Sequence, residues 1–259
     1  SPPRTCVEAA VFGFLGGGVV VLQMEGVSFA YGPAPVLQGF SLRVGRGEFV
    51  SLVGPSGSGK STIFRLLTGL LSPAAGRVEV LGGPPGPGRL GYLPQGGSLM
   101  AWRTALENAA AGLEVRGVSP REARERARAL FPEFGLAGAE GRYPHQLSGG
   151  MRQRVAFLRT VLGGHEALLL DEPFGALDAL TRAQMQGWLL DLWERLGKTV
   201  LFITHDAEEA ALLSDRVYVL KGAGVEMAVN LPRPRRIGML SDPALVERRA
   251  AILREVGLC

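Results

Sequence analysis

One glycine-rich segment, Gly54 to Ser61, constrains this chain more than any other part of its sequence. It reads GPSGSGKS and matches the pattern GxxxxGK(S/T) in full. The residues just before it, Phe49 to Val53, predict a buried strand. Residues at helical spacing follow it: Ile63, Leu66, Leu67 and Leu70, with Gly69 near the predicted end. A strand, a glycine turn and a helix in this order direct several backbone N–H groups and the positive end of a helix dipole at one point. The segment therefore predicts a phosphate-binding site in an α/β sheet.

Two side chains of this segment add specific chemistry. Lys60 is placed to reach the β- and γ-phosphates of a nucleotide, and the Ser61 hydroxyl is placed to ligate Mg²⁺. A glycine turn that matches the pattern by chance is the alternative, and the strand and helix on its two sides argue against it. We expect nucleotide contacts from Gly54, Pro55, Ser56, Gly57, Ser58, Gly59, Lys60, Ser61 and Thr62.

A second apolar strand ends in two adjacent carboxylates. Leu168 to Leu170 lead directly into Asp171 and Glu172. Open α/β sheets place their ligands at the carboxyl ends of strands, so we expect Asp171 to help fix Mg²⁺ and its waters. Glu172 is placed to polarise the attacking water as a general base. Two surface acids are the alternative reading, but Pro173 and a further acid, Asp178, follow within one turn-like segment.

A third motif, LSGGMRQR from Leu147 to Arg154, resembles the signature of ATP-binding-cassette (ABC) proteins, which other P-loop enzymes generally lack. A serine hydroxyl and free glycine N–H groups at a helix start make another anion site. The resemblance implies that two cassettes form a homodimer, head to tail, in the ATP-bound state. Ser148, Gly149 and Gly150 of one cassette would then close over the ATP of the other.

The resemblance spans roughly residues 20–225 and assigns four further positions. It implies that Tyr31 stacks on the adenine and that Gln95 senses and ligates Mg²⁺ while linking the site to a helical subdomain. Asp178 would contact the nucleotide region of the opposite cassette, and His205 the γ-phosphate. Glu172, His205 and Gln95 are thus the expected catalytic residues, with ATP as substrate and Mg²⁺ as its ion.

Two segments depart from the family pattern. Arg159-Thr160-Val161 stands where the family usually has Ala-Arg-Ala, and residues 96–100 are less typical than their surroundings. The second segment lies where the resemblance places the docking permease, so this departure concerns the partner and not hydrolysis.

The order of apolar and amphipathic stretches predicts the fold class. Glycine-bounded apolar runs alternate with helical patterns, as in a mostly parallel α/β sheet. The run Val200 to Thr204 adds a further buried strand. The resemblance makes this a RecA-like P-loop core with an N-terminal antiparallel β portion and an inserted α-helical subdomain. Ser119-Pro120-Arg121-Glu122 has the capping-box form of a helix start inside that insertion.

The chain is expected to divide into three parts. An ABC ATPase domain covers residues 20–229, with the helical subdomain at about 96–160, and a C-terminal tail covers 230–259, with a last helix around 243–256. Residues 1–19 are interpreted as an extension upstream of the natural start. Their apolar run is too short and too rich in glycine for a confident membrane span.

The composition adds limits rather than identity. The formal charge is +4, and the arginines of residues 121–128 alternate with Glu122 and Glu125 as on a solvated helix face, so no nucleic-acid partner is expected. Cys6 and Cys259 stand at opposite ends without metal-ligand spacing, which favours free thiols in a reducing cytoplasm.

Details of the motifs indicate the kind of ABC protein. The run DEPFGALD from Asp171, and the DAEEA that follows His205, resemble bacterial importers. Residues 100–104 and Leu231 to Arg235 resemble the nitrate, sulfonate and taurine group, which includes transporters of thiamine pyrimidine precursors. The resemblance implies integral membrane permease subunits, an extracytoplasmic solute-binding protein as an indirect partner, and a peripheral place on the cytoplasmic face of the inner membrane.

Two other classes of function stay open at this point. A non-transport ABC ATPase, coupling hydrolysis to a soluble partner, would usually show tandem cassettes or a long coiled-coil insertion. A small-molecule kinase or GTPase would need an acceptor pocket or a guanine-reading motif, and would not need the element Ser148 to Gly150.

Overall fold

The computed structural model describes residues 19–221 and 225–257, which form two β-sheets flanked by helices. The strands are β1 (Val20–Tyr31), β2 (Ala34–Gly45), β3 (Phe49–Val53), β4 (Ala75–Val80), β5 (Gly91–Leu93), β6 (Ala167–Asp171), β7 (Thr199–Thr204), β8 (Arg216–Val219) and β9 (Val225–Ala228). The helices are α2 (Lys60–Leu67), α3 (Ala105–Glu114), α4 (Pro120–Leu130), η1 (Pro144–Gln146), α5 (Gly149–Leu162), α6 (Ala179–Leu196), α7 (Ala207–Leu213), η2 (Ile237–Ser241) and α8 (Pro243–Val256). Within these ranges no helix is both long and apolar enough to cross a membrane.

The larger sheet confirms the predicted parallel core. Its order is β5-β6-β7-β3-β8-β9, and every pairing is parallel except that of β8 with β9. Strands β3, β6 and β7 are buried along their whole length, which explains why each is a nearly continuous apolar run. Because they are parallel neighbours, the segments that follow Val53, Asp171 and Thr204 lie at one edge of the sheet.

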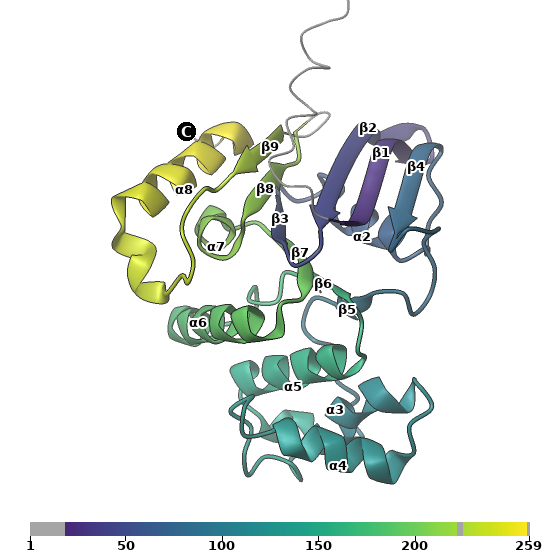
Figure 1. Cartoon of the computed structure of the whole chain (residues 1–259), viewed down its shortest axis with the longest axis vertical. Coiled ribbons are helices and arrows are strands. Elements are labelled where there is room, and N and C mark those ends of the chain that lie inside the picture. The colour runs from purple at the N-terminus through teal and green to yellow at the C-terminus, as the bar shows by residue number, and fades with distance from the viewer. Residues whose placement is uncertain (1–18, 222–224, 258–259) are drawn as a thin grey trace, which may run out of the picture.

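The smaller sheet is antiparallel, with the order β2-β1-β4, as the family resemblance implied for the N-terminal part. It shares a core with one face of the parallel sheet. Strand alternation sends Val50 and Leu52 into that core together with Ile63 of α2, while Phe49 and Val53 point into the other core. The second core is covered by α5, α6, α7 and α8, so the parallel sheet is buried on both faces (Figure 1).

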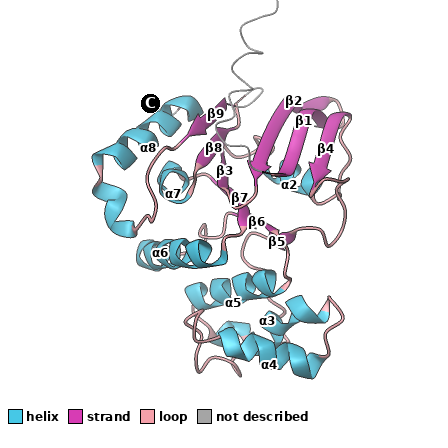
Figure 2. Cartoon of the chain, viewed as in Figure 1, coloured by secondary structure: helices cyan, strands magenta, loops and turns pink. Residues whose placement is uncertain are grey.

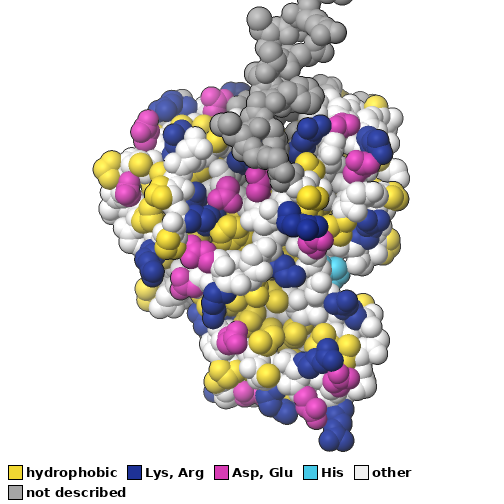
Figure 3. Space-filling model, in the orientation of Figure 1, with side chains coloured by type: hydrophobic (Ala, Val, Ile, Leu, Met, Phe, Trp, Pro, Cys, Tyr) yellow, Lys and Arg dark blue, Asp and Glu magenta, His cyan; other side chains and the backbone are white. Residues whose placement is uncertain are grey.

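Helices α3, α4 and α5 form a layer of their own, which follows β5 and precedes β6 in the chain (Figures 1 and 2). Helix α4 begins as predicted, because the Ser119 side chain accepts from the backbone N–H of Glu122 and Pro120 is its first residue. The reciprocal half of the capping box is absent, since Glu122 pairs with Arg126 instead. Ala123 and Ala127 face the core, while the charged side chains of α4 face solvent at the lower end of the molecule (Figure 3).

The end of α2 and the position of the last helix can be compared with the predictions from the sequence. Helix α2 ends at Leu67, so Leu70 is not part of it and its side chain is 69% exposed. Gly69 has φ +75°, a left-handed backbone that stops the helix, in agreement with its place near the predicted end. The last predicted helix is confirmed as α8, with Asp242 as its N-cap.

The interpretations of residues 1–19 and of Cys6 and Cys259 lie outside the described residues, apart from Val19.

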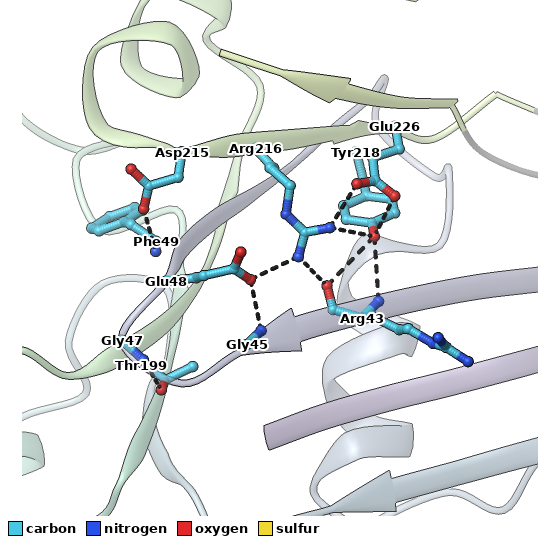
Figure 4. Close-up of polar contacts among 10 residues, drawn as sticks. All are labelled: Arg43, Gly45, Gly47, Glu48, Phe49, Thr199, Asp215, Arg216, Tyr218 and Glu226. Carbon is cyan, nitrogen blue, oxygen red and sulfur yellow. Dashed lines mark hydrogen bonds and ion pairs between the residues drawn. The ribbon is translucent and has the colours of Figure 1, made fainter. Parts of the chain in front are cut away.

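A polar cluster around Arg216 of β8 joins the two sheets (Figure 4). Its guanidinium donates to Glu48 Oε2 at 2.7 Å, to Glu226 Oε1 at 2.6 Å and to the backbone oxygen of Arg43 on β2 at 2.7 Å. The Tyr218 hydroxyl donates to the other oxygen of Glu226 at 2.8 Å. The Arg216 side chain is only 14% exposed, so these bonds form with little competition from water.

We expect the substitution Arg216→Met to lower the free energy of unfolding by about 2 kcal/mol, because it leaves the half-buried Glu48 carboxylate and the exposed Glu226 carboxylate without their shared, buried cation. Urea denaturation at neutral pH measures this. The matched control is Arg77→Met, which removes an exposed pair with Glu79 and should cost at most about 0.5 kcal/mol. Equal losses in the two variants would contradict a structural role for the cluster.

Candidate functional site

The loop between β3 and α2 is shaped by glycine. Gly57 and Gly59 have φ values of +81° and +98°. A Cβ on Gly59 would lie 3.0 Å from the Val36 side chain and 3.1 Å from that of Leu37, so the position is tight as well as left-handed. Gly59 is the N-cap of α2 and provides no side-chain acceptor, which leaves the first N–H groups of the helix available to a ligand.

Lys60 folds back over this loop. Its Nζ donates to the backbone oxygens of Gly54 at 2.7 Å and Pro55 at 2.9 Å, and the residue is 7% exposed. Burial lowers the pKa of the Lys60 ammonium, while the nearby carboxylates of Glu172 and Asp171 act in the opposite direction. The cation and the two acids therefore share one electrostatic site.

Asp171 ends β6 and is almost fully buried, with 8% exposure. The Tyr92 hydroxyl donates to its Oδ2 at 3.2 Å. Burial raises the pKa of Asp171, and the hydrogen bond from Tyr92 and the charge of Lys60 oppose this shift. Burial and the carboxylate together raise the pKa of Tyr92 to about 12. Sequence reasoning missed Tyr92; its only signal was a place on a short strand just before Gln95.

Three predicted catalytic side chains meet at one oxygen atom. Gln95 Nε2 donates to Glu172 Oε2 at 3.3 Å, and His205 Nδ1 lies 3.4 Å from the same oxygen. Glu172 has φ +44°, a left-handed backbone that is strained for a residue with a side chain. Its N–H is held by the backbone oxygen of Ile203 on β7 at 3.0 Å, so the neighbouring strand stabilises this conformation.

Tyr31 lies at the end of β1, at the margin of this group. Tyr31 is 49% exposed, so it is not part of the hydrophobic core. Arg65 of α2 donates to its hydroxyl at 3.1 Å, and the ring packs edge-on against Phe29. A hydrogen bond with Thr62 lowers the pKa of Tyr31, and Arg65 adds to this effect. Ser61 is exposed in the first turn of α2, while Thr62 is buried.

The serine-glycine motif begins helix α5. The exposed Ser148 is its N-cap and accepts from the backbone N–H of Met151 at 3.2 Å. Gly150 is buried, and a Cβ there would lie 2.9 Å from the Thr181 side chain of α6. The motif thus packs closely on the start of α6, and only glycine permits this approach.

Asp178 is the N-cap of that neighbouring helix. It accepts from the Thr181 N–H at 3.0 Å and from the Thr181 hydroxyl at 2.6 Å. These bonds lower the pKa of Asp178, which is fully exposed. A Cβ on Gly149 would lie 3.2 Å from Leu177, so the two motifs are adjacent in one chain.

The predicted site residues therefore fall into two groups. Lys60, Gln95, Asp171, Glu172 and His205 lie together at the edge of the sheet. Ser148 to Gly150 and Asp178 lie together at the starts of α5 and α6. Within residues 19–221 and 225–257, no hydrogen bond or ion pair joins a member of one group to a member of the other.

The two segments that departed from the family pattern contact each other. Arg159 of α5 donates to the backbone oxygens of Gly97 at 2.8 Å and Ser98 at 3.0 Å. Burial lowers the pKa of the Arg159 guanidinium. The unusual arginine therefore fixes the unusual loop that follows Gln95.

Comparisons with known proteins agree with these motifs. The family described as "ABC transporter" matches residues 37–175. The formylaminopyrimidine import ATP-binding protein ThiZ of Halalkalibacterium halodurans is 42% identical over 239 residues, which cover 91% of this chain and 94% of that protein. The aliphatic sulfonates import ATP-binding protein SsuB 1 of Rhodococcus jostii is 45% identical over 222 residues, covering 85% of this chain and 88% of that one.

A solved structure gives the same result for the fold. The ATP-binding cassette MJ0796, in a dimeric post-hydrolysis state with ADP and Pi, superimposes with a TM-score of 0.70. It is 30% identical and covers 82% of this chain and 100% of its own. The family match and these relatives show that the chain, with its glycine loop after β3 and its carboxylates Asp171 and Glu172, belongs to the ABC transporter family and is an ATPase of the ATP-binding-cassette type.

Proposed function

We propose that this ATPase powers the import of a small solute of the sulfonate, taurine, nitrate or formylaminopyrimidine kind. It would act on the cytoplasmic face of the inner membrane, bound to permease subunits that receive the solute from an extracytoplasmic binding protein. The relatives named above, both import ATP-binding proteins, support the importer class. The observation that carries the catalytic part is the convergence of Gln95 and His205 on Glu172, beside Lys60.

The β3–α2 loop would bind the phosphates of ATP. Its N–H groups and the Lys60 ammonium provide positive charge, and a phosphate there would compensate the cost of burying that ammonium. The exposed ring of Tyr31 would stack on the adenine. These contacts orient the γ-phosphate towards the carboxylates at the ends of β6 and β7.

The residues present also fit Mg²⁺. Ser61, Asp171 and Gln95 supply hydroxyl, carboxylate and amide oxygens, the hard ligands that this ion prefers. Together with phosphate oxygens they would hold it, and a bound ion would neutralise charge on the phosphates. Among the described residues there is no cluster of three or more His, Cys, Asp or Glu side chains that could hold a metal ion.

Glu172 would act on the attacking water. Gln95 and His205 both face Oε2 of its carboxylate, which leaves the other oxygen, Oε1, to accept a hydrogen bond from water. His205, whose side chain is 61% exposed, would brace the γ-phosphate when ATP is present.

The second group of motif residues calls for a second copy of the chain. Ser148, Gly149 and Gly150 would contact the γ-phosphate held by the partner's loop, and Asp178 would contact the partner near that site. Among the described residues of one chain, no hydrogen bond or ion pair joins the two groups, which supports the proposal that the second group serves the ATP of the partner. Closure depends on the γ-phosphate, so ADP holds the closed dimer less well.

We also propose the division of the chain expected from its sequence. The ATPase domain comprises residues 20–229, the helical subdomain about 96–160, and the tail 230–259. The packing of α3 against α4 and α5, and of α8 against α7 and η2, supports these boundaries.

Glu172→Gln should reduce ATP turnover by at least about 100-fold, because the amide cannot accept a proton from water. ATP should still bind, and the variant should accumulate as an ATP-trapped dimer. Phosphate release and size-exclusion chromatography with ATP and Mg²⁺ measure both effects. A variant that stays monomeric at saturating ATP would count heavily against the composite site.

Ser148→Arg should lower turnover about 100-fold or more, since its bulk and charge disrupt the surface that meets the partner's γ-phosphate. Binding of a fluorescent ATP analogue to the monomer should be unchanged, because Lys60 and its loop are intact. Lys60→Ala is the matched comparison and should lose that binding. Intact turnover in Ser148→Arg would show that the signature assignment is wrong.

The importer assignment predicts a membrane partner. Affinity purification of the tagged chain from gently solubilised native membranes should recover a multi-span permease, identified by mass spectrometry. Its paired binding protein then allows the solute to be screened directly. Recovery of only soluble partners, such as ribosomal or DNA-repair proteins, would leave the ATPase in place and overturn the importer in favour of a non-transport ABC protein.

A further inference from the structure

A buried carboxylate that the proposed reaction does not use lies four residues after His205. Glu209 of α7 is 5% exposed, and both of its oxygens are bonded. Its Oε2 accepts from the Thr204 hydroxyl at 2.5 Å, and its Oε1 accepts from Gln186 Nε2 at 3.2 Å. Burial raises the pKa of Glu209, and these two bonds oppose the shift. An ionisable side chain is almost never this buried unless its polar atoms have partners, as both oxygens of Glu209 do.

The partner of Glu209, Thr204, controls the turn that carries His205. Thr204 is the last residue of β7 and is 1% exposed. Its hydroxyl donates to Glu209 and also accepts from the backbone N–H of Asp206 at 3.0 Å. The same oxygen therefore ties the residue before His205 to the residue after it, and Glu209 fixes the direction of that hydroxyl.

Helix α7 does not need the Glu209 side chain for its own ends. Asp206 Oδ1 caps its first turn by accepting from the N–H of Glu208 at 2.8 Å. At its other end, the buried guanidinium of Arg235 donates to the backbone oxygens of Leu212 at 3.2 Å and Ser214 at 2.6 Å. The carboxylate of Glu209 is thus directed inward, to the strand end and to α6, and not to the helix ends.

The contact with α6 extends the network. Gln186 is 6% exposed and lies in the middle of α6, the helix whose N-cap is Asp178. One turn earlier on the same helix, Arg182 Nη1 lies 3.9 Å from Asp206 Oδ2. Two residues of α6 therefore hold the turn around His205 from the side of the neighbouring motif.

We propose that Glu209 is a positioning residue for His205: through Thr204 it holds the imidazole in place for the γ-phosphate, and through Gln186 it ties that placement to α6. This inference rests on the role given to His205 under the proposed function. It concerns turnover and not ATP affinity, because Glu209 does not contact the loop that binds the phosphates.

The first test is Glu209→Ala together with Thr204→Val, which removes the hydroxyl and keeps the shape of the side chain. Each should lower kcat by about tenfold to 100-fold, the loss expected when a catalytic group is misplaced by about 1 Å. The KM for ATP should stay close to wild type in both variants, while the thermal midpoint of Thr204→Val should fall by a few degrees because a buried carboxylate loses a donor. A wild-type kcat in Thr204→Val would overturn the proposal.

The second test is rescue by Glu209→Gln. A glutamine at position 209 can accept a hydrogen bond from the Thr204 hydroxyl through its Oε1. Its Nε2 can donate to Gln186 once the Gln186 amide has rotated by 180° to present its oxygen. The variant should therefore keep kcat within about twofold of wild type, since all of these hydrogen bonds can re-form. Glu208→Ala is the matched control: it removes a neighbouring carboxylate that pairs with Arg249 of α8, and it should leave kcat unchanged. Loss of activity in Glu209→Gln equal to that in Glu209→Ala would contradict the positioning role.

A cycle with His205→Ala separates this inference from the proposed function. If Glu209 acts through His205, Glu209→Ala should lower kcat no further in the His205→Ala background. A full multiplicative loss in the double variant would overturn the inference and leave the role of His205 intact. A wild-type kcat in His205→Ala alone would overturn the role of His205 and the inference with it.

Discussion

The site depends on one constraint, the parallel pairing of three fully buried strands. Strand β7 lies between β6 and β3, so the ends of all three meet at one edge of the sheet. There the phosphate loop, the acids Asp171 and Glu172, and His205 come together although they are far apart in the chain. Because the strands are buried on both faces, their ends are held rigidly, and each polar group that follows starts from a fixed position.

Charge is balanced locally at this edge. The cation of Lys60 is buried beside two carboxylates, and Asp171 is bonded by Tyr92. Burial shifts the pKa of Lys60 down and that of Asp171 up, so burial destabilises each charged form and the opposite charge nearby opposes this effect. Such an arrangement favours a ligand that carries both negative and positive charge, as a nucleotide with a bound cation does.

Outside the site, several arginines form hydrogen bonds between segments that are distant in the sequence. Arg216 joins the two sheets through carboxylates and a backbone oxygen, Arg159 holds the loop after Gln95, and Arg235 satisfies carbonyl groups at the end of α7. A planar guanidinium with five donors suits each of these tasks better than a lysine would. The basic composition of the chain is thus partly structural.

The sequence by itself determined the chemistry: the phosphate loop, the strand ending in Asp171 and Glu172, and the serine-glycine motif are local patterns whose spacing carries their meaning. Strands β3, β6 and β7 were predictable because buried parallel strands are continuous apolar runs. Only the tertiary structure decided that Gln95, 77 residues before Glu172, bonds to that carboxylate, and that Tyr92 and Glu209 serve the same edge. Those contacts join distant segments, and no local pattern encodes which strand ends will become neighbours.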